Sequence, residues 1–274
     1  MTGYPSIDKP WLKYYSDEAI NAVIPDVSIY DWIKMNNINN HRNVAINYLG
    51  YKVTYGNLFQ QIENAASAFS AIGVKANDIV TLALPNIPEN LICIYALNRI
   101  GAIANLIDLR CQGEDLIRYY NEVNSKYAVV CDIYLANTID VVDRTALKHL
   151  IVASPYDHLP VVLRNVMKNK HRVPQESTID ITEWREFTKG KAACIPSVDI
   201  KVDDTACIMH TSGTTGTSKG VMLSNRCFNA MTVEYKYGYG YFEPGEIFLT
   251  RSRHFWHIVL LLLFISPLAY SFLW

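Results

Sequence analysis

The chain has 274 residues, half of them hydrophobic, and a formal net charge of −1. A chain of this length and apolar content can bury a large core in one or two domains. Acidic and basic residues are mixed along the sequence, which argues against nucleic acid or another polyanion as a partner. No positively charged start leads into an apolar stretch, so no secretory signal is expected.

The cysteines are scattered and give no metal-binding pattern. They are Cys93, Cys111, Cys131, Cys194, Cys207 and Cys227. None forms a C-x-x-C pair, and no paired histidines accompany them, so we expect no metal ligands among them. Reduced thiols in a cytoplasmic protein are the interpretation that this spacing favours.

The first elements that the pattern predicts are a hairpin, a helix and a buried strand. Short alternating runs at 44–48 and 52–55 flank Gly50, which is typical of a hairpin. Apolar residues then recur at helical spacing over 58–72, and Gly73 ends the run. Residues 79–84 form an apolar strand that stops at Pro85.

Strands and helix-length segments alternate after that point. The pattern predicts helices at 90–100 and 114–123 and strands at 102–106, 127–131 and 149–153. Strands separated by helices imply βαβ units. The expected fold class is therefore α/β, with a mostly parallel sheet flanked by helices.

The stretch 154–200 is less regular and carries four prolines, so we expect a surface excursion there. One short helix is predicted near 181–187, where Asp180 and Glu183 are spaced for a capping box. A strand at 205–209, its partner at 221–223 and a helix at 229–237 are expected next, with Ser224 as the N-cap of that helix.

The segment 208–220 has the composition of a phosphate-binding loop. It reads Ile-Met-His-Thr-Ser-Gly-Thr-Thr-Gly-Thr-Ser-Lys-Gly and follows an apolar strand. Glycines let backbone N–H groups approach an anion, hydroxyls add short donors, and Lys219 adds a compact positive charge. The spacing matches neither G-x-x-x-x-G-K-[ST] nor G-x-G-x-x-G.

This loop resembles the signature of the adenylate-forming superfamily, which includes acyl-CoA synthetases, luciferases and peptide-synthetase adenylation domains. That signature is a hydrophobic residue, two variable residues, T-S-G-T-T-G, one variable residue that is usually proline, and Lys-Gly; here Ser218 takes the proline position. Segments 53–58, 84–89 and 97–108 resemble the motifs that precede the loop in this family. The apolar lead-in at 9–15 and 28–32 looks closest to acyl-CoA ligases.

The resemblance implies a two-step reaction. A carboxylate attacks the α-phosphate of ATP and expels pyrophosphate, and a thiol, usually coenzyme A, then takes the acyl group from the adenylate. Mg²⁺ would spread the charge that accumulates on the phosphates. The residues that we expect to cradle the ATP phosphates are Thr211, Ser212, Gly213, Thr214, Thr215, Gly216, Thr217 and Lys219.

No residue is assigned a catalytic role, because the catalytic lysine of the family belongs to a separate small C-terminal domain and Lys219 does not match it. His210 is expected to be a side chain placed by packing beside the loop. Asp108 and Arg110 are expected to make structural hydrogen bonds rather than to act as a catalytic pair.

Residues 1–250 are expected to form part of the large AMP-binding domain, and the resemblance ends near Thr250. The adenine-clamping Y-G-x-T-E motif, the ribose-binding aspartate and the small C-terminal domain are not found in the sequence. His257 lies about one position from where a pocket histidine is expected, and it receives no role.

The segment 251–274 is an apolar tail that departs from the family, and from Ile258 to Trp274 it carries no charged residue. Three interpretations compete: a membrane-spanning segment, a core strand and helix of the genuine fold, and a shifted reading frame near Thr250. The abrupt end of the resemblance favours the shifted frame.

Two functions follow from these observations. In the first, the chain is a truncated portion of an ATP-dependent, AMP-forming carboxylic acid:CoA ligase that is not competent alone. In the second, it is a non-catalytic nucleotide-binding or inert fragment, attached to a membrane through 258–274. The resemblance of the N-terminal segment to acyl-CoA ligases favours a fatty or aromatic acid over an amino acid as the substrate.

Overall fold

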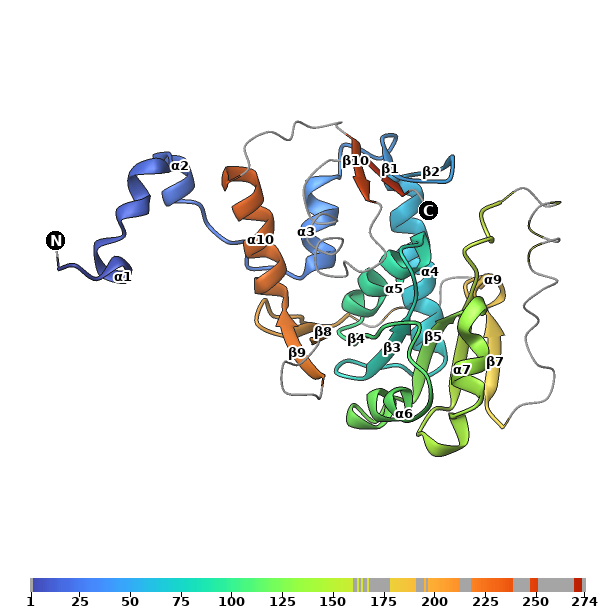
Figure 1. Ribbon diagram of the computed structural model, residues 1–274. Helices are drawn as coiled ribbons and strands as arrows, with labels where there is room; N and C mark the ends of the chain where they lie inside the picture. Colours follow the sequence, from blue (N-terminus) through green and yellow to red (C-terminus); the bar gives the residue numbers. More distant parts are fainter. Residues whose placement is uncertain are drawn as a thin grey trace.

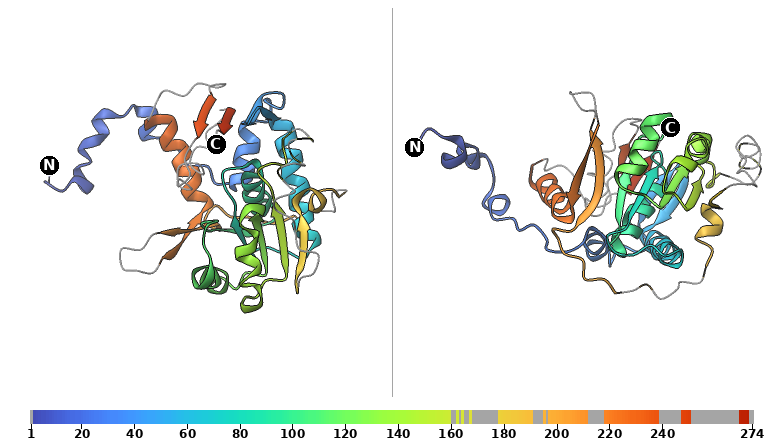
Figure 2. Two further views of the ribbon diagram at one scale, coloured as in Figure 1. Left: turned by 45° about the vertical axis from the view of Figure 1, so that its right-hand side comes forward. Right: turned by 90° about the horizontal axis from the view of Figure 1, so that it is seen from below.

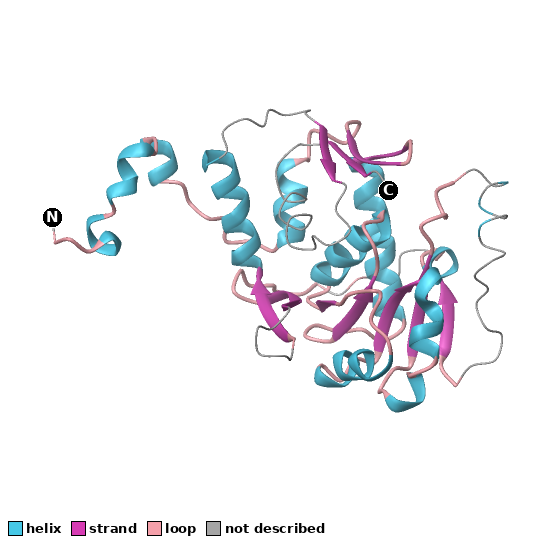
Figure 3. Ribbon diagram, viewed as in Figure 1, coloured by secondary structure: helices cyan, strands magenta, loops and turns pink. Residues whose placement is uncertain are grey.

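The computed structural model describes residues 2–159, 178–190, 195, 197–211, 218–238, 247–250 and 269–272, together with residues 162, 164 and 167. A large sheet and a small sheet organise these residues (Figures 1 and 3). The small sheet has the order β10-β11-β1-β2 and the large sheet the order β7-β6-β5-β3-β4-β8-β9.

Six neighbouring strands of the large sheet run parallel, and β9 alone is antiparallel to its neighbour β8. The strands in chain order are β3 (Ile79–Ala83), β4 (Ile103–Leu106), β5 (Tyr127–Cys131), β6 (His149–Ala153), β7 (Asp180–Glu183), β8 (Thr205–Thr211) and β9 (Lys219–Ser224). The chain goes from β3 to β4 on one side and then crosses to β5 on the other. The expected mostly parallel α/β sheet is confirmed.

Helices cover both faces of this sheet (Figure 2). One face packs against α3 (Ile29–Asn36), α4 (Tyr55–Ala71) and α5 (Pro88–Arg99), and the other against α6 (Gly113–Glu122) and α7 (Leu135–Ile139). Single 3₁₀ turns, η2 (Asp132–Tyr134) and η3 (Val142–Arg144), precede and follow α7.

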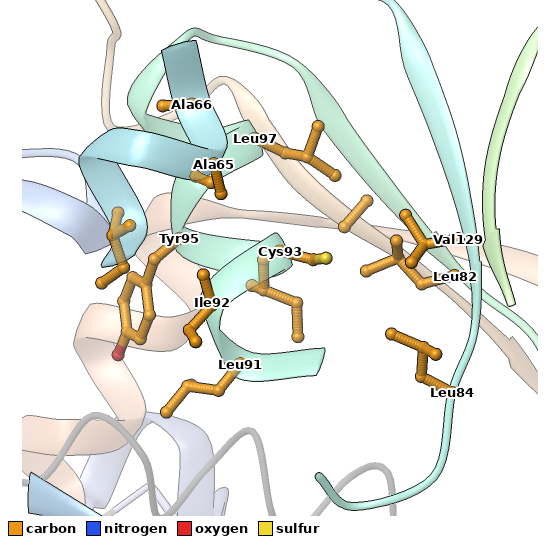
Figure 4. Close-up of a cluster of buried hydrophobic side chains, with 14 of the residues drawn as sticks. Ala65, Ala66, Leu82, Leu84, Leu91, Ile92, Cys93, Tyr95, Leu97 and Val129 are labelled. Carbon is orange, nitrogen blue, oxygen red and sulfur yellow. The ribbon is translucent and has the colours of Figure 1, made fainter. Parts of the chain in front are cut away.

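Helix α5 is buried on every side, which explains why its sequence shows no polar face. Leu91, Cys93 and Leu97 of this helix lie among side chains from α4 and from the sheet (Figure 4). Leu82 and Val129 belong to the neighbouring strands β3 and β5. A helix that is apolar all round must be covered on all sides, and α4, α3 and the sheet supply that cover.

The hairpin β1 (Val44–Tyr48) and β2 (Tyr51–Thr54) has the expected position. Its two turn residues, Leu49 and Gly50, have φ values of 51° and 87°. Left-handed backbone at both positions gives the twist that a two-residue hairpin needs. Thr54 then caps α4, because its hydroxyl accepts a hydrogen bond from the Asn57 amide at 3.3 Å.

The small sheet includes two strands near the end of the sequence. Strand β11 (Ala269–Phe272) lies parallel to β1 on one side and to β10 (Ile247–Thr250) on the other. Residues 251–268 lie outside the described residues, and so does His257. The membrane interpretation of the tail stays a prediction, because most of the tail lies outside the described residues. Among the described helices, none is long and apolar enough to cross a membrane.

The predicted capping box at Asp180 and Glu183 is wrong. Residues 180–183 form β7, the edge strand that pairs in parallel with β6, and only Trp184–Phe187 are helical as α9. Glu183 takes the N-cap position of α9, but its side chain does not cap the helix. The alternating Ile179 and Ile181 pack against the second core cluster, and this burial outweighs the local helix signal.

Helix α10 (Asn225–Gly238) begins four residues before the predicted start, directly after Ser224. At its first residue, the Asn225 side chain is fully buried. It accepts hydrogen bonds from the Ile29 amide and from Asn98, and it donates to the carbonyls of Lys201 and Asp204. These contacts fix α10 to α3, α5 and the segment before β8.

The first residues form an arm that leads away from the two sheets (Figure 1). It contains α1 (Pro5–Asp8), η1 (Pro10–Tyr14) and α2 (Asp17–Ile20), none of which buries a residue. Tyr237 of α10 donates a hydrogen bond to Glu18 at 2.9 Å, which connects α2 to the body of the molecule.

Candidate functional site: the β8–β9 hairpin

The predicted phosphate loop is the tip of an antiparallel hairpin. Strand β8 ends at Thr211 and β9 begins at Lys219, and these two residues are paired across the ladder. The middle of the predicted cradle, Ser212, Gly213, Thr214, Thr215, Gly216 and Thr217, lies outside the described residues. The structure therefore brings together the two ends of the cradle, Thr211 and Lys219.

The hairpin tip lies at the edge of the sheet where open α/β folds bind their ligands. Because β8 is parallel to β4, its end at Thr211 lies on the same edge as the carboxyl ends of β3, β4 and β5. Ligands of open α/β sheets bind outside the carboxyl ends of the strands.

Side-chain hydrogen bonds join the two strands where they meet the loop. The Ser218 hydroxyl donates to the Thr211 carbonyl at 2.6 Å, and the Thr211 hydroxyl lies 3.5 Å from the Lys219 carbonyl. Ser218 thus supplies a side-chain hydrogen bond at the position where proline is usual in the family. Lys219 is exposed, and no carboxylate in the described part of the chain pairs with its ammonium group. This cation is available to an anionic ligand.

Gly220 is required by close packing against β8. A Cβ atom at this position would lie 3.0 Å from the Ile208 side chain and 3.3 Å from Cε1 of His210. Both contacts are tighter than ordinary van der Waals distances, so a larger residue would push the hairpin strands apart. The glycine after Lys219 therefore keeps the lysine-bearing strand against β8.

His210 lies directly before the cradle and is held by packing, as the sequence predicts. Its ring makes an edge-on contact with Tyr119 of α6, with centroids 4.5 Å apart. Its Nε2 lies 2.8 Å from Oδ1 of Asn105 in β4. Burial is the main cause that lowers the pKa of His210; the Glu122 carboxylate opposes the shift and the Arg118 guanidinium adds to it.

Asn105 was not predicted as a site residue. It occupies the apolar strand that was predicted at 102–106 and is fully buried. A lone amide within a run of buried apolar residues is the signal that could have identified it, because a buried amide needs hydrogen-bond partners.

Asp108 and Arg110 make the structural contact that we expected. The Arg110 backbone amide and its Nε each lie 2.9 Å from Oδ1 of Asp108. Both side chains are more than a third exposed, and this pair follows β4 on the surface. In the described part of the chain, no group of three His, Cys, Asp or Glu side chains is arranged to hold a metal ion.

Comparison with known proteins identifies the family. The sequence model of the AMP-binding enzyme family matches residues 35–271, which is most of the chain. The chain therefore belongs to the AMP-binding enzyme family. The matched range includes the β8–β9 hairpin and runs into the apolar tail, whose expected departure from the family stays a prediction.

Curated relatives are acyl-CoA ligases of two kinds. An acetyl-coenzyme A synthetase from Rhizobium rhizogenes strain K84 is 30% identical over 212 residues, which cover 73% of this chain and 31% of that protein. A long-chain-fatty-acid–CoA ligase from Escherichia coli O6:H1 is 26% identical over 264 residues, which cover 91% of this chain and 46% of that protein. The chain thus spans less than half the length of these relatives.

Solved structures agree on the fold. The crystal structure of a long-chain-fatty-acid-CoA ligase from Archaeoglobus fulgidus superimposes with a TM-score of 0.71 at 18% identity, covering 91% of this chain and 47% of that one. The N-terminal domain of an inhibitor-bound protein from Mycobacterium tuberculosis gives a TM-score of 0.67 at 19% identity, covering 90% and 57% of the two chains.

Proposed function

We propose that this chain is a portion of an ATP-dependent, AMP-forming carboxylic acid:CoA ligase, and that its β8–β9 hairpin holds the phosphates of ATP. One observation carries the proposal. Thr211 and the exposed Lys219 face each other across the hairpin at the carboxyl edge of the sheet, within a chain that belongs to the AMP-binding family. Glycine-rich backbone and a lysine are the groups that bind phosphate oxygens.

The proposed cradle is Thr211 to Thr217 together with Lys219. Its task is to position the β- and γ-phosphates and to neutralise the charge of the leaving pyrophosphate. Mg²⁺ would enter with the nucleotide and be held chiefly by phosphate oxygens, since Mg²⁺ is usually bound through substrate phosphates and few protein ligands. Coenzyme A and a carboxylic acid are the further substrates, and a fatty acid is the class that we favour.

Removal of the Lys219 ammonium group should weaken ATP binding. We expect Lys219→Ala to lower the affinity for magnesium–ATP at least about tenfold, because a charge-assisted contact contributes about 1.5 to 3 kcal/mol and each 1.4 kcal/mol is about a tenfold change. Isothermal titration calorimetry measures the dissociation constant. Lys75→Ala is the matched control, since Lys75 is also exposed but precedes β3 and so lies at the opposite edge of the sheet.

Equal affinities of the wild type and Lys219→Ala for magnesium–ATP would show that Lys219 does not contribute to nucleotide binding. Failure of the wild type to bind ATP saturably would overturn the nucleotide-binding part of the proposal altogether.

We infer that the 274 residues bind nucleotide but do not complete the reaction, because they contain no Y-G-x-T-E segment to clamp adenine. The alternative is a binding-only or inert fragment, with the apolar segment 258–274 as a membrane attachment of an otherwise cytoplasmic protein. ATP–pyrophosphate exchange with acetate, aromatic acids and fatty acids of increasing length tests for turnover. We expect no exchange above background. Carboxylate-dependent exchange by the purified chain would exclude the alternative and would also contradict our inference that the chain does not complete the reaction.

A further inference from the structure

Strand β9 is an open edge of the large sheet (Figure 1). It is the last strand in the order β7-β6-β5-β3-β4-β8-β9, so within the described part of the chain only β8 pairs with it. An edge strand presents a row of backbone N–H and C=O groups that have no ladder partner. These groups are a template for pairing with a further strand.

The side chains of β9 leave this edge accessible. Val221 and Met222, in the middle of the strand, have exposed fractions of 43% and 64%. Successive side chains of a strand point to opposite faces of the sheet. Leu223 packs against the core cluster that contains α4 and α5, so Val221 lies on that face and Met222 on the other. Apolar surface is therefore exposed on both faces of one edge.

The opposite edge of the same sheet is better protected. Strand β7 has four residues, and it begins and ends with exposed carboxylates, Asp180 and Glu183. A short edge strand with charged side chains resists pairing with another chain. Strand β9 has six residues, none of them proline, and its one charged residue, Lys219, is at its first position. The middle of β9 has no such protection.

The position of Lys219 favours an antiparallel arrangement of two copies. A two-fold axis perpendicular to the sheet, at Val221 or Met222, places the two Lys219 residues about 13 to 20 Å apart along the strands. Salt screens most of the repulsion between exposed charges at that distance. Parallel pairing in register would place the two lysines side by side, about 5 Å apart.

Antiparallel pairing also directs Lys219 toward a region of the second copy with more acidic than basic residues. Lys219 of one copy lies toward the other end of the second hairpin, where Thr205 pairs with Ser224. The charged residues grouped at that end are Asp26, Asp203, Asp204, Lys201 and Arg226. Three carboxylates and two cations leave one negative charge in excess, which is complementary to Lys219.

We propose that β9 is an interaction edge whose partner is a second copy of this chain, joined by antiparallel β9–β9 pairing across a two-fold axis. The pairing extends the large sheet and shields Val221 and Met222 of both copies from water. It uses the same edge of each copy, so the product is a closed dimer and not a filament. This inference does not depend on nucleotide binding at the hairpin.

The contact is small, so the dimer should form reversibly. One strand of six residues from each copy, with two exposed apolar side chains, covers less surface than the interfaces of permanent dimers. We expect the wild type to change from monomer to dimer as its concentration rises. Sedimentation velocity over a dilution series measures the dissociation constant.

Met222→Lys tests the proposed edge. The substitution replaces an exposed apolar side chain by a charge at or next to the two-fold axis, where the lysines of the two copies meet. We expect the dissociation constant of the dimer to rise about tenfold or more. Met35→Lys is the matched control, because Met35 is also an exposed methionine, with an exposed fraction of 58%, but lies on helix α3. It should dimerise as the wild type does.

Hydrogen–deuterium exchange of the wild type tests the same edge and needs no variant to fold. Peptides covering 219–224 should exchange more slowly at high than at low protein concentration, and peptides covering β7 should not change.

Three results would overturn the inference. They are a wild type that stays monomeric, association that Met222→Lys leaves unchanged, and association beyond a dimer. Protection of 219–224 at every concentration would show that another segment of the same chain covers the edge, which also overturns it. All of these outcomes leave the proposed ATP site standing, since that proposal is tested by calorimetry with magnesium–ATP.

Discussion

Asn225 shows how one side chain can join segments that are distant in the sequence. Its oxygen accepts from the Ile29 amide at 3.0 Å and from Asn98 at 2.8 Å, and its nitrogen donates to two carbonyls. Every hydrogen-bonding position of the amide is therefore used. This network connects the start of α10, and through it the strand that carries Lys219, to the core.

Loss of this amide should destabilise the protein strongly. Asn225→Ala leaves the Ile29 amide and the side-chain nitrogen of Asn98 without their acceptor in a buried site, while the Lys201 and Asp204 carbonyls keep backbone donors; we expect a loss of about 3 kcal/mol in the free energy of unfolding. Urea denaturation measures the change. Asn121→Ala is the control, because Asn121 is exposed and donates one hydrogen bond, to the Arg144 carbonyl; it should change stability by less than about 0.5 kcal/mol. Similar losses in the two variants would contradict this role.

At the scale of elements, the sequence predicts best where a segment carries its own signal. Strands β5 and β6 begin and end at the predicted residues, because each is an apolar run bounded by polar residues. Strand β7 was not predicted. It is an edge strand, and its pairing with β6 depends on the packing of Ile179 and Ile181 against a core cluster formed by residues distant in the sequence. Local capping spacing at Asp180 and Glu183 carries no information about that partner.

The β8–β9 hairpin could be predicted from the sequence only in part. The motif alone predicts that a strand leads into the loop and that Lys219 is exposed to a ligand. It does not predict that the ladder continues to the Thr211–Lys219 pair. Nor does it predict the hydrogen bonds that lead from His210 through Asn105 of β4 and Thr81 of β3 to Ser125, just before β5. Those contacts join four strands, β8, β4, β3 and the start of β5, and only the folded sheet brings them together.

At the scale of the whole molecule, two packed core clusters hold the seven-stranded sheet and place the hairpin at its carboxyl edge. The family match covers residues 35–271, while the chain spans 31% to 46% of the curated relatives described above. We therefore propose a function for one part of the fold: ATP binds at the β8–β9 hairpin.

Hydrogen–deuterium exchange with and without saturating magnesium–ATP tests that claim most directly, because it reports where the nucleotide protects the backbone. We predict that peptides spanning residues 205–224 exchange more slowly in the complex and that peptides from β6 and β7 do not change. At an ATP concentration close to the wild-type dissociation constant, Lys219→Ala should show much less of this protection than the wild type. Protection confined to other segments, or none in 205–224 under conditions where ATP is bound, would contradict the account.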